Sequence, residues 1–126
     1  LLGGMGDGGG CHPRDNIALS WLAREIDLSY DWYESLMECR ERQTDWMAEL
    51  IIDAHGKTGL PIVILGKCFK KETNLTVGSP SILLRNILAE GKYPVDMYDP
   101  WVDSDEPPLQ SPAVFFIGTN HDVFKS

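Results

Sequence analysis

The sequence has few cysteines, an excess of acidic over basic residues and no long apolar run, and each shortage excludes a class of protein. Its three cysteines, Cys11, Cys39 and Cys68, show no CxxC spacing, which argues against a disulfide framework and predicts a reducing, cytoplasmic setting. The net charge of −8 makes nucleic acids and anionic membrane surfaces unexpected partners. No apolar run approaches the roughly 18 residues that suggest a transmembrane helix. The three histidines show no metal-ligand spacing, so no metal is expected.

The segment richest in chemistry is Gly8-Gly9-Gly10-Cys11-His12-Pro13-Arg14-Asp15, near the start of the chain. Pro13 suits the first position of a helix, because the N–H that it lacks has no helical partner there. Cys11 would then lie at or just before the helix N-terminus, where unpaired N–H groups favour a thiolate. Asp15 follows one turn later, and the glycines allow a substrate to approach closely. The arrangement is typical of a covalent nucleophile beside a carboxylate that manages protons or water, rather than of a cysteine buried after a turn.

Two helices are expected after the glycines. Apolar residues at helical spacing predict the first over residues 13–27. Ser29 is expected to cap a second helix that ends at Gly56 and spans about 27 residues, or about 40 Å. Its apolar stripe, which includes Met47 and Leu50, is longer than a chain of this size can bury alone. The stripe is either ordinary core or the seam of a dimer.

The pattern changes in the second half of the chain. Ile62–Leu65 is a continuous apolar run, which is typical of a parallel strand buried on both faces. Ser79 is expected to cap a helix that begins at Pro80, and further strands are expected at 94–98 and 113–117. Strand, helix and strand in this order imply a right-handed crossover and a Rossmann-like half-domain.

These elements predict an α/β protein in two parts. Residues 1–58 form a catalytic-cysteine loop and a helical dimerisation region with a long helix. Residues 59–126 form a partial Rossmann-like, three-layer domain with a parallel sheet. Three lysines follow the first strand, at the edge where open α/β sheets bind ligands. Lys70 is placed to pair with a diphosphate and Phe69 to line a sugar pocket; the alternative is a solvated lysine cluster with Phe69 in the core.

Four segments occur in a fixed order along the chain: Gly8-Gly9-Gly10-Cys11-His12-Pro13-Arg14-Asp15, Ile64-Leu65-Gly66-Lys67-Cys68-Phe69-Lys70-Lys71-Glu72-Thr73 with Ser79-Pro80, Tyr98-Asp99-Pro100, and Thr119-Asn120-His121-Asp122-Val123-Phe124. Together they resemble the UDP-glucose/GDP-mannose 6-dehydrogenase family. The first segment is similar to the family's active-site signature. The second is similar to the strand and loop that open its nucleotide-sugar-binding domain. The resemblance covers essentially the whole chain.

The resemblance implies an NAD-dependent, two-step oxidation of the C6 alcohol of a nucleotide sugar to a carboxylate. It implies that Cys11 captures the intermediate aldehyde as a thiohemiacetal, that a second hydride transfer gives a thioester, and that Asp15 assists its hydrolysis. It further implies a homodimer through the long helix. The remaining implied contacts are substrate binding by Gly8, Gly9, Gly10, Phe69 and Lys70, and cofactor binding by Arg14.

Two residues depart from the family pattern. Asp7 stands where many members carry an aromatic or apolar residue, and Val77 where many carry an arginine that reaches the cofactor. The family's dinucleotide-binding domain and its upstream lysine have no counterpart in this sequence, so we interpret the chain as a fragment that is inactive alone. Two alternatives stay open: a non-catalytic nucleotide-sugar-binding module, and a thiol-redox protein built on Cys11, which has no resolving cysteine nearby.

Overall fold

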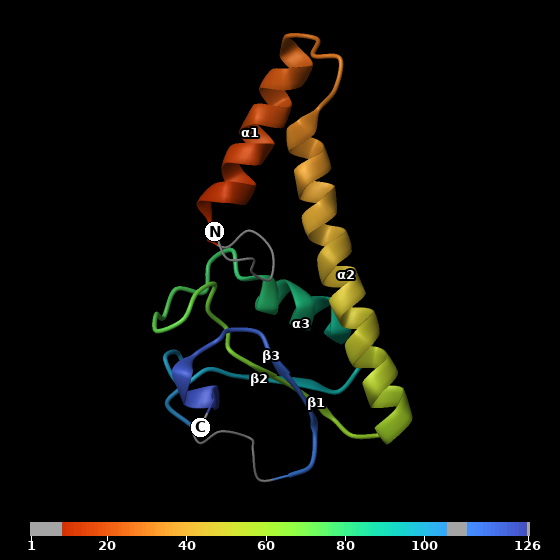
Figure 1. Ribbon diagram of the computed structural model, residues 1–126, viewed down its shortest axis with the longest axis vertical. Helices are drawn as coiled ribbons and strands as arrows, with labels where there is room; N and C mark the ends of the chain where they lie inside the picture. Colours follow the sequence, from red (N-terminus) through yellow and green to blue (C-terminus); the bar gives the residue numbers. More distant parts are fainter. Residues whose placement is uncertain (1–8, 106–110, 126) are drawn as a thin grey trace.

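The computed structural model describes residues 9–105 and 111–125 and consists of a helical hairpin joined to a small parallel sheet. Figure 1 shows the two hairpin helices, α1 and α2, projecting from the sheet, with α3 between α2 and the strands. The elements in chain order are α1 (Cys11–Glu25), α2 (Trp32–Thr58), β1 (Ile62–Leu65), α3 (Pro80–Glu90), β2 (Val95–Tyr98), β3 (Val114–Ile117) and a short 3-10 helix, η1 (Asp122–Lys125).

The hairpin turn is built around Asp31, which caps the start of α2. Its carboxylate accepts the backbone N–H groups of Tyr33 and Glu34 at 3.1 and 3.0 Å. The buried hydroxyl of Ser20 on α1 donates to the same carboxylate at 2.5 Å. The hydrogen bond from Ser20, followed by the one from Glu34 N–H, lowers the pKa of Asp31. The prediction that Ser29 caps this helix is therefore wrong, because an aspartate two residues later satisfies the free N–H groups.

The end of α2 also differs from the prediction. The helix continues through Gly56 and stops at Gly59, which has a φ of +67° and donates its N–H to the carbonyl of His55 at 2.7 Å. A left-handed residue that closes the last turn in this way is the usual role of a glycine after a helix. Gly56 lies within the helix and does not end it.

The apolar stripe of α2 divides into two faces. Met47, Ala48 and Ile51 are buried and pack into the core against β1 and α3. Trp46 and Leu50 lie on another face and are 57% and 51% exposed. The single stripe expected from the sequence is therefore half core and half surface.

The sheet has the strand order β2-β1-β3, with both pairs parallel. This order confirms the partial α/β architecture expected from the sequence. Ile62 and Ile64 of β1 meet Leu84 and Leu88 of α3 in a fully buried core. Helices α3 and α2 cover this face of the sheet, whereas Phe115 and Ile117 of β3 are partly exposed on the other.

No helix among the described residues is both long enough and apolar enough to cross a membrane.

Candidate active site

A mainly apolar cavity of about 410 Å³ lies where the start of α1 meets the loop after β1. Cys11, the first residue of α1, is exposed at this cavity, and Pro13 lies within the first turn. The residue before the helix is Gly10, which offers no side-chain cap to the free N–H groups. The lining residues are Gly9, Gly10, Cys11, Phe69, Leu75 and Val77.

Glycines let the two segments approach closely. A side chain at Gly9 would begin 3.5 Å from the ring of Phe69. Gly78, with a φ of +72°, lies directly against the backbone of Gly9 and Gly10, and any side chain there would collide with the Gly9 carbonyl. The structure therefore joins the thiol-bearing segment and the loop after β1 by backbone packing, which only glycine permits. Gly8, also expected at this site, lies outside the described residues.

Arg14 and Asp15 form an exposed pair one turn into α1. The Nε of Arg14 donates to Oδ1 of Asp15 at 2.9 Å. This hydrogen bond is the main cause of a raised pKa for the Arg14 guanidinium. Asp15 thus follows Cys11 by one helical turn, as expected, and its carboxylate is paired with Arg14.

The loop after β1 carries three lysines with different partners. Lys67 pairs with Asp103 at 2.5 Å, and Lys71 pairs with Asp122 at 3.3 Å. The ammonium group of Lys70 lies 5.5 Å from the ring centroid of Phe69. Within residues 9–105 and 111–125, Lys70 has no carboxylate at ion-pairing distance, unlike Lys67 and Lys71.

Asp99, at the end of β2, is a buried carboxylate surrounded by donors. Its Oδ2 accepts the N–H groups of Lys67 and Cys68 at 2.6 and 3.2 Å, and its Oδ1 accepts the N–H of Trp101 at 2.9 Å. Burial raises the pKa of Asp99, but these donors and the side chains of Cys68 and His121 outweigh it and hold the pKa below its usual value. The carboxylate therefore stays charged inside the protein.

His121 completes this buried cluster. Its Nδ1 accepts the N–H of Glu72 at 2.9 Å, so the ring carries its proton on Nε2, which lies 3.1 Å from Oδ2 of Asp99. The Cys68 thiol donates to the carbonyl of Thr73 at 2.8 Å. Burial, together with the nearby charge of Asp99, raises the pKa of Cys68 to about 12, so this thiol is not a nucleophile.

The ligand atoms of Cys68, Asp99 and His121 lie within 4.8 Å of one another, a spacing that would also suit a metal ion. Each of these atoms already takes part in a hydrogen bond inside the protein. We therefore assign them to a hydrogen-bonded cluster. The sequence placed Asp99 and His121 in matching motifs without a role. The signal available was a polar residue shortly after each of two strands: Asp99 directly follows β2, and His121 lies in the short segment after β3.

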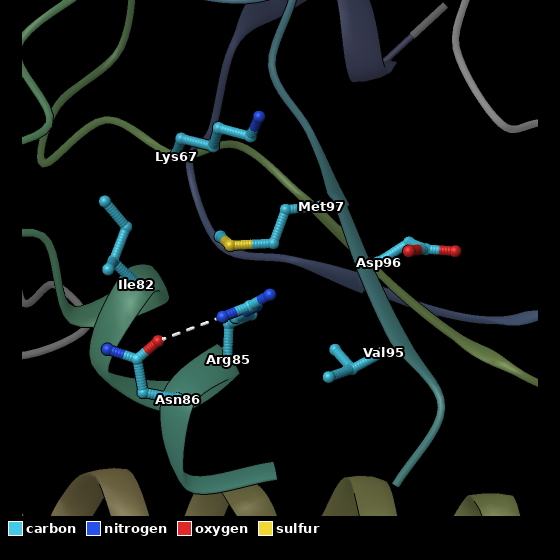
Figure 2. Close-up of a pocket in the computed structure, with 7 residues that line it drawn as sticks. All are labelled: Lys67, Ile82, Arg85, Asn86, Val95, Asp96 and Met97. Carbon is cyan, nitrogen blue, oxygen red and sulfur yellow. Dashed lines mark hydrogen bonds between the residues drawn. The ribbon is translucent and has the colours of Figure 1, made fainter. Parts of the chain in front are cut away.

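A second cavity of about 410 Å³ lies between α3 and β2 and shares no residue with the first. Figure 2 shows Arg85 and Asn86 of α3 joined by a hydrogen bond, with Asp96 pointing away from them. The residues that line it are Lys67, Ile82, Arg85, Asn86, Val95, Asp96 and Met97. It contains neither the exposed thiol nor Phe69, so we place the candidate site at the cavity beside Cys11.

Comparison with known proteins shows that the chain is similar to several sugar-nucleotide dehydrogenases. No protein-family model matches the chain. A UDP-glucose 6-dehydrogenase of Bacillus subtilis is 28% identical over 99% of this chain and 29% of its own length. A GDP-mannose 6-dehydrogenase of Pseudomonas putida is 35% identical over 76% of this chain and 21% of its own length. The structure of a UDP-D-ManNAc dehydrogenase from Pyrococcus horikoshii superposes with a TM-score of 0.80 at 26% identity, covering 98% of this chain and 31% of that one. The chain therefore spans less than a third of each relative.

Proposed function

We propose that this chain, whose resemblance to the UDP-glucose/GDP-mannose 6-dehydrogenases is confirmed by its relatives, supplies the catalytic thiol and part of the sugar-nucleotide site of such an enzyme. The reaction is the NAD-dependent oxidation of a sugar C6 alcohol to a carboxylate, in the cytoplasm. The observation that carries the proposal is the exposed Cys11 at the first position of α1, in one cavity with Phe69.

The thiol accounts for an oxidation that proceeds through two stages, of which the first removes a hydride and a proton from the C6 alcohol and leaves an aldehyde. The Cys11 sulfur adds to C6 of the intermediate aldehyde, and the carbonyl oxygen takes up a proton, which gives a thiohemiacetal. Loss of a hydride and a proton from this adduct gives a thioester. Water then attacks the thioester carbon, Asp15 receives the proton, and the acid leaves as the Cys11 thiol is restored. NAD, when bound, supplies the acceptor for both hydrides.

Arg14 is the residue of this chain that fits a contact with the cofactor. It is exposed beside Cys11, and its guanidinium uses one N–H on Asp15 and keeps other donors for a phosphate.

The substrate is a nucleotide sugar held by the loop after β1. Phe69 lies against Gly9 and lines the cavity, and Lys70 beside it carries the charge that a diphosphate requires. Gly9 and Gly10 line the cavity beside Cys11 that the sugar would enter, and Gly8, outside the described residues, is expected to join them. On this assignment residues 1–58 carry the thiol and the dimer contact, and residues 59–126 bind the nucleotide.

The dimer contact is the exposed apolar face of the hairpin. Trp21 on α1 and Trp46 and Leu50 on α2 are each at least half exposed. A two-fold pairing of α2 with its copy would cover such a face.

Leu50→Glu should therefore give monomers in sedimentation, whereas Glu49→Gln should not. Met47, an obvious choice from the sequence, is a poor test because it lies in the core. A monomeric unmodified protein at micromolar concentration would contradict the contact.

The test of the reaction counts cofactor against product. With UDP-glucose or GDP-mannose, the full-length protein should reduce two NAD for each sugar acid released. Cys11→Ser should abolish acid formation but still bind the nucleotide sugar, and Cys39→Ser, which removes an exposed thiol from α2, should leave turnover unchanged. Acid production by the Cys11 variant at the wild-type rate would remove this thiol from the mechanism.

A second candidate is a nucleotide-sugar-binding module without catalysis, because the chain holds less than a third of each relative's length. The 126-residue chain with NAD and UDP-glucose should form no NADH. NADH formation by this chain alone would contradict both the fragment interpretation and the module.

A further inference from the structure

We propose that Asp99 and His121 are positioning residues: they hold the loop 67–72 at both of its ends and thereby aim Phe69 and Lys70 at the ligand. The ligand named here is the nucleotide sugar, so this part of the inference rests on the proposed function. The holding of the loop rests on hydrogen bonds alone.

The first end of the loop is fixed by Asp99. Its carboxylate accepts two successive N–H groups, those of Lys67 and Cys68, immediately before Phe69. The hydroxyl of Thr119 donates to the carbonyl of Cys68 at 2.6 Å, so the next peptide is also held, from the segment that follows β3. Because Asp99 is charged and buried, its bonds to these N–H groups are of the strong, charge-assisted kind.

The second end is fixed by His121. Its Nδ1 accepts the N–H of Glu72, two residues after Lys70. The ring is fully buried and stacks on Trp101, with the two ring centroids 6.1 Å apart. Its Nε2 contacts the carboxylate of Asp99. Asp99 and His121 are therefore in contact with each other, and each forms hydrogen bonds to a different end of the loop.

Phe69 and Lys70 lie between these two ends. The N–H of Phe69 donates to the carbonyl of Leu75, and its ring is half-buried against Gly9, while Lys70 is exposed. A short segment held at both ends keeps few alternative conformations. The ligand then meets side chains that are already in place, which lowers the entropy lost on binding.

The central variant is His121→Phe, which removes both hydrogen bonds and keeps a ring beside Trp101. His121→Asn places its side-chain carbonyl near the position of Nδ1 and should restore the acceptor for Glu72. Asn120→Ser, an exposed neighbour, is the matched control. Hydrogen–deuterium exchange of the full-length protein, followed by mass spectrometry, compares the peptide covering 67–72 with the one covering β1.

In His121→Phe, exchange in 67–72 should rise about tenfold, as expected for the loss of a buried hydrogen bond, while exchange in β1 stays unchanged. The Michaelis constant for UDP-glucose or GDP-mannose should rise by about tenfold with little change in kcat, because the loop contributes binding rather than chemistry. His121→Asn should recover most of both effects. A role confined to global stability would instead speed exchange in β1 and 67–72 alike, and that result would overturn the proposal.

If His121→Phe does not fold, His121→Gln answers the same question. It keeps a donor for Asp99 and withdraws the acceptor from Glu72, so exchange should rise at residue 72 and remain slow at Cys68. Unchanged exchange at residue 72 would overturn the proposal. A wild-type protein that binds neither UDP-glucose nor GDP-mannose would overturn the proposed function, while the exchange data would still decide whether the loop is held.

Discussion

The start of α1 and the loop after β1 each carry a cysteine, but in opposite surroundings. Cys11 is exposed at a helix start, beside an exposed pair of charges. Cys68 is 1% exposed, donates to a carbonyl, and has a pKa raised to about 12. The two thiols thus differ in access: Cys11 is open to solvent, whereas Cys68 is buried and hydrogen-bonded within its own loop.

The difference extends to the carboxylates of the two regions. Asp15 meets solvent and one arginine, whereas Asp99 meets three backbone N–H groups and a histidine inside the protein. A carboxylate exposed to water remains available to move protons. A carboxylate saturated by buried donors instead holds its neighbours in place.

The largest expected effect of breaking this contrast is on stability. Asp99→Asn should destabilise the protein by about 3 kcal/mol, because it places an amide among N–H groups that need an acceptor. Asp15→Asn should have no measurable effect, since its pair lies in water. Urea unfolding measures the free energy of unfolding of both variants. Equal values for the two would contradict the proposed difference between the two carboxylates.

The next effect concerns binding by the lysines of the loop. Lys70→Ala should weaken UDP-glucose binding by about 10- to 150-fold, the range for a charge-assisted hydrogen bond of roughly 1.5–3 kcal/mol. Lys71→Ala should change binding less, because Lys71 already pairs with Asp122. Calorimetry on the full-length protein compares the two. Equal dissociation constants for the wild type and Lys70→Ala would place Lys70 on the solvated surface.

The smallest effect is on acid stability. The pKa of Asp99 lies below its ordinary value of 3.8 in the folded protein, so its charged form favours folding at neutral pH. This contribution should be lost as the pH falls through the range below about 5, where the unfolded chain takes up the proton first. Asp99→Asn should show a shallower loss of stability in acid than Asp96→Asn, an exposed control. Parallel curves for the two variants would contradict the assignment.

The sequence predicted the elements whose signal is local. The apolar run Ile62–Leu65 is β1 and Pro80 opens α3, because each depends on neighbouring residues. The first helix was also predicted, but it spans Cys11–Glu25 and so begins two residues before the expected Pro13. The predicted cap of α2 was wrong because Ser29 and Asp31 are both suitable capping residues. The contact between Asp31 and Ser20 on α1, which the sequence does not show, favours Asp31. Helical spacing also could not show that α3 and β1 cover only the Met47 face of α2.

The candidate site divides in the same way. The glycines and Cys11 are recognisable from their order along the chain. The link between Asp99 and His121 joins residues that stand in separate segments after β2 and β3, and it exists only once the parallel sheet brings these strand ends together. The carboxylate partners of Lys67 and Lys71, which distinguish these two lysines from Lys70, also depend on tertiary contacts.

Alkylation of the native full-length protein tests the central claim most directly. Iodoacetamide, followed by peptide mapping, should label Cys11 rapidly and leave Cys68 unmodified, with the exposed Cys39 as an internal reference. UDP-glucose or GDP-mannose should slow the labelling of Cys11 and leave that of Cys39 unchanged. Labelling of Cys68 as fast as Cys11, or labelling of Cys11 that neither nucleotide sugar slows, would contradict the account.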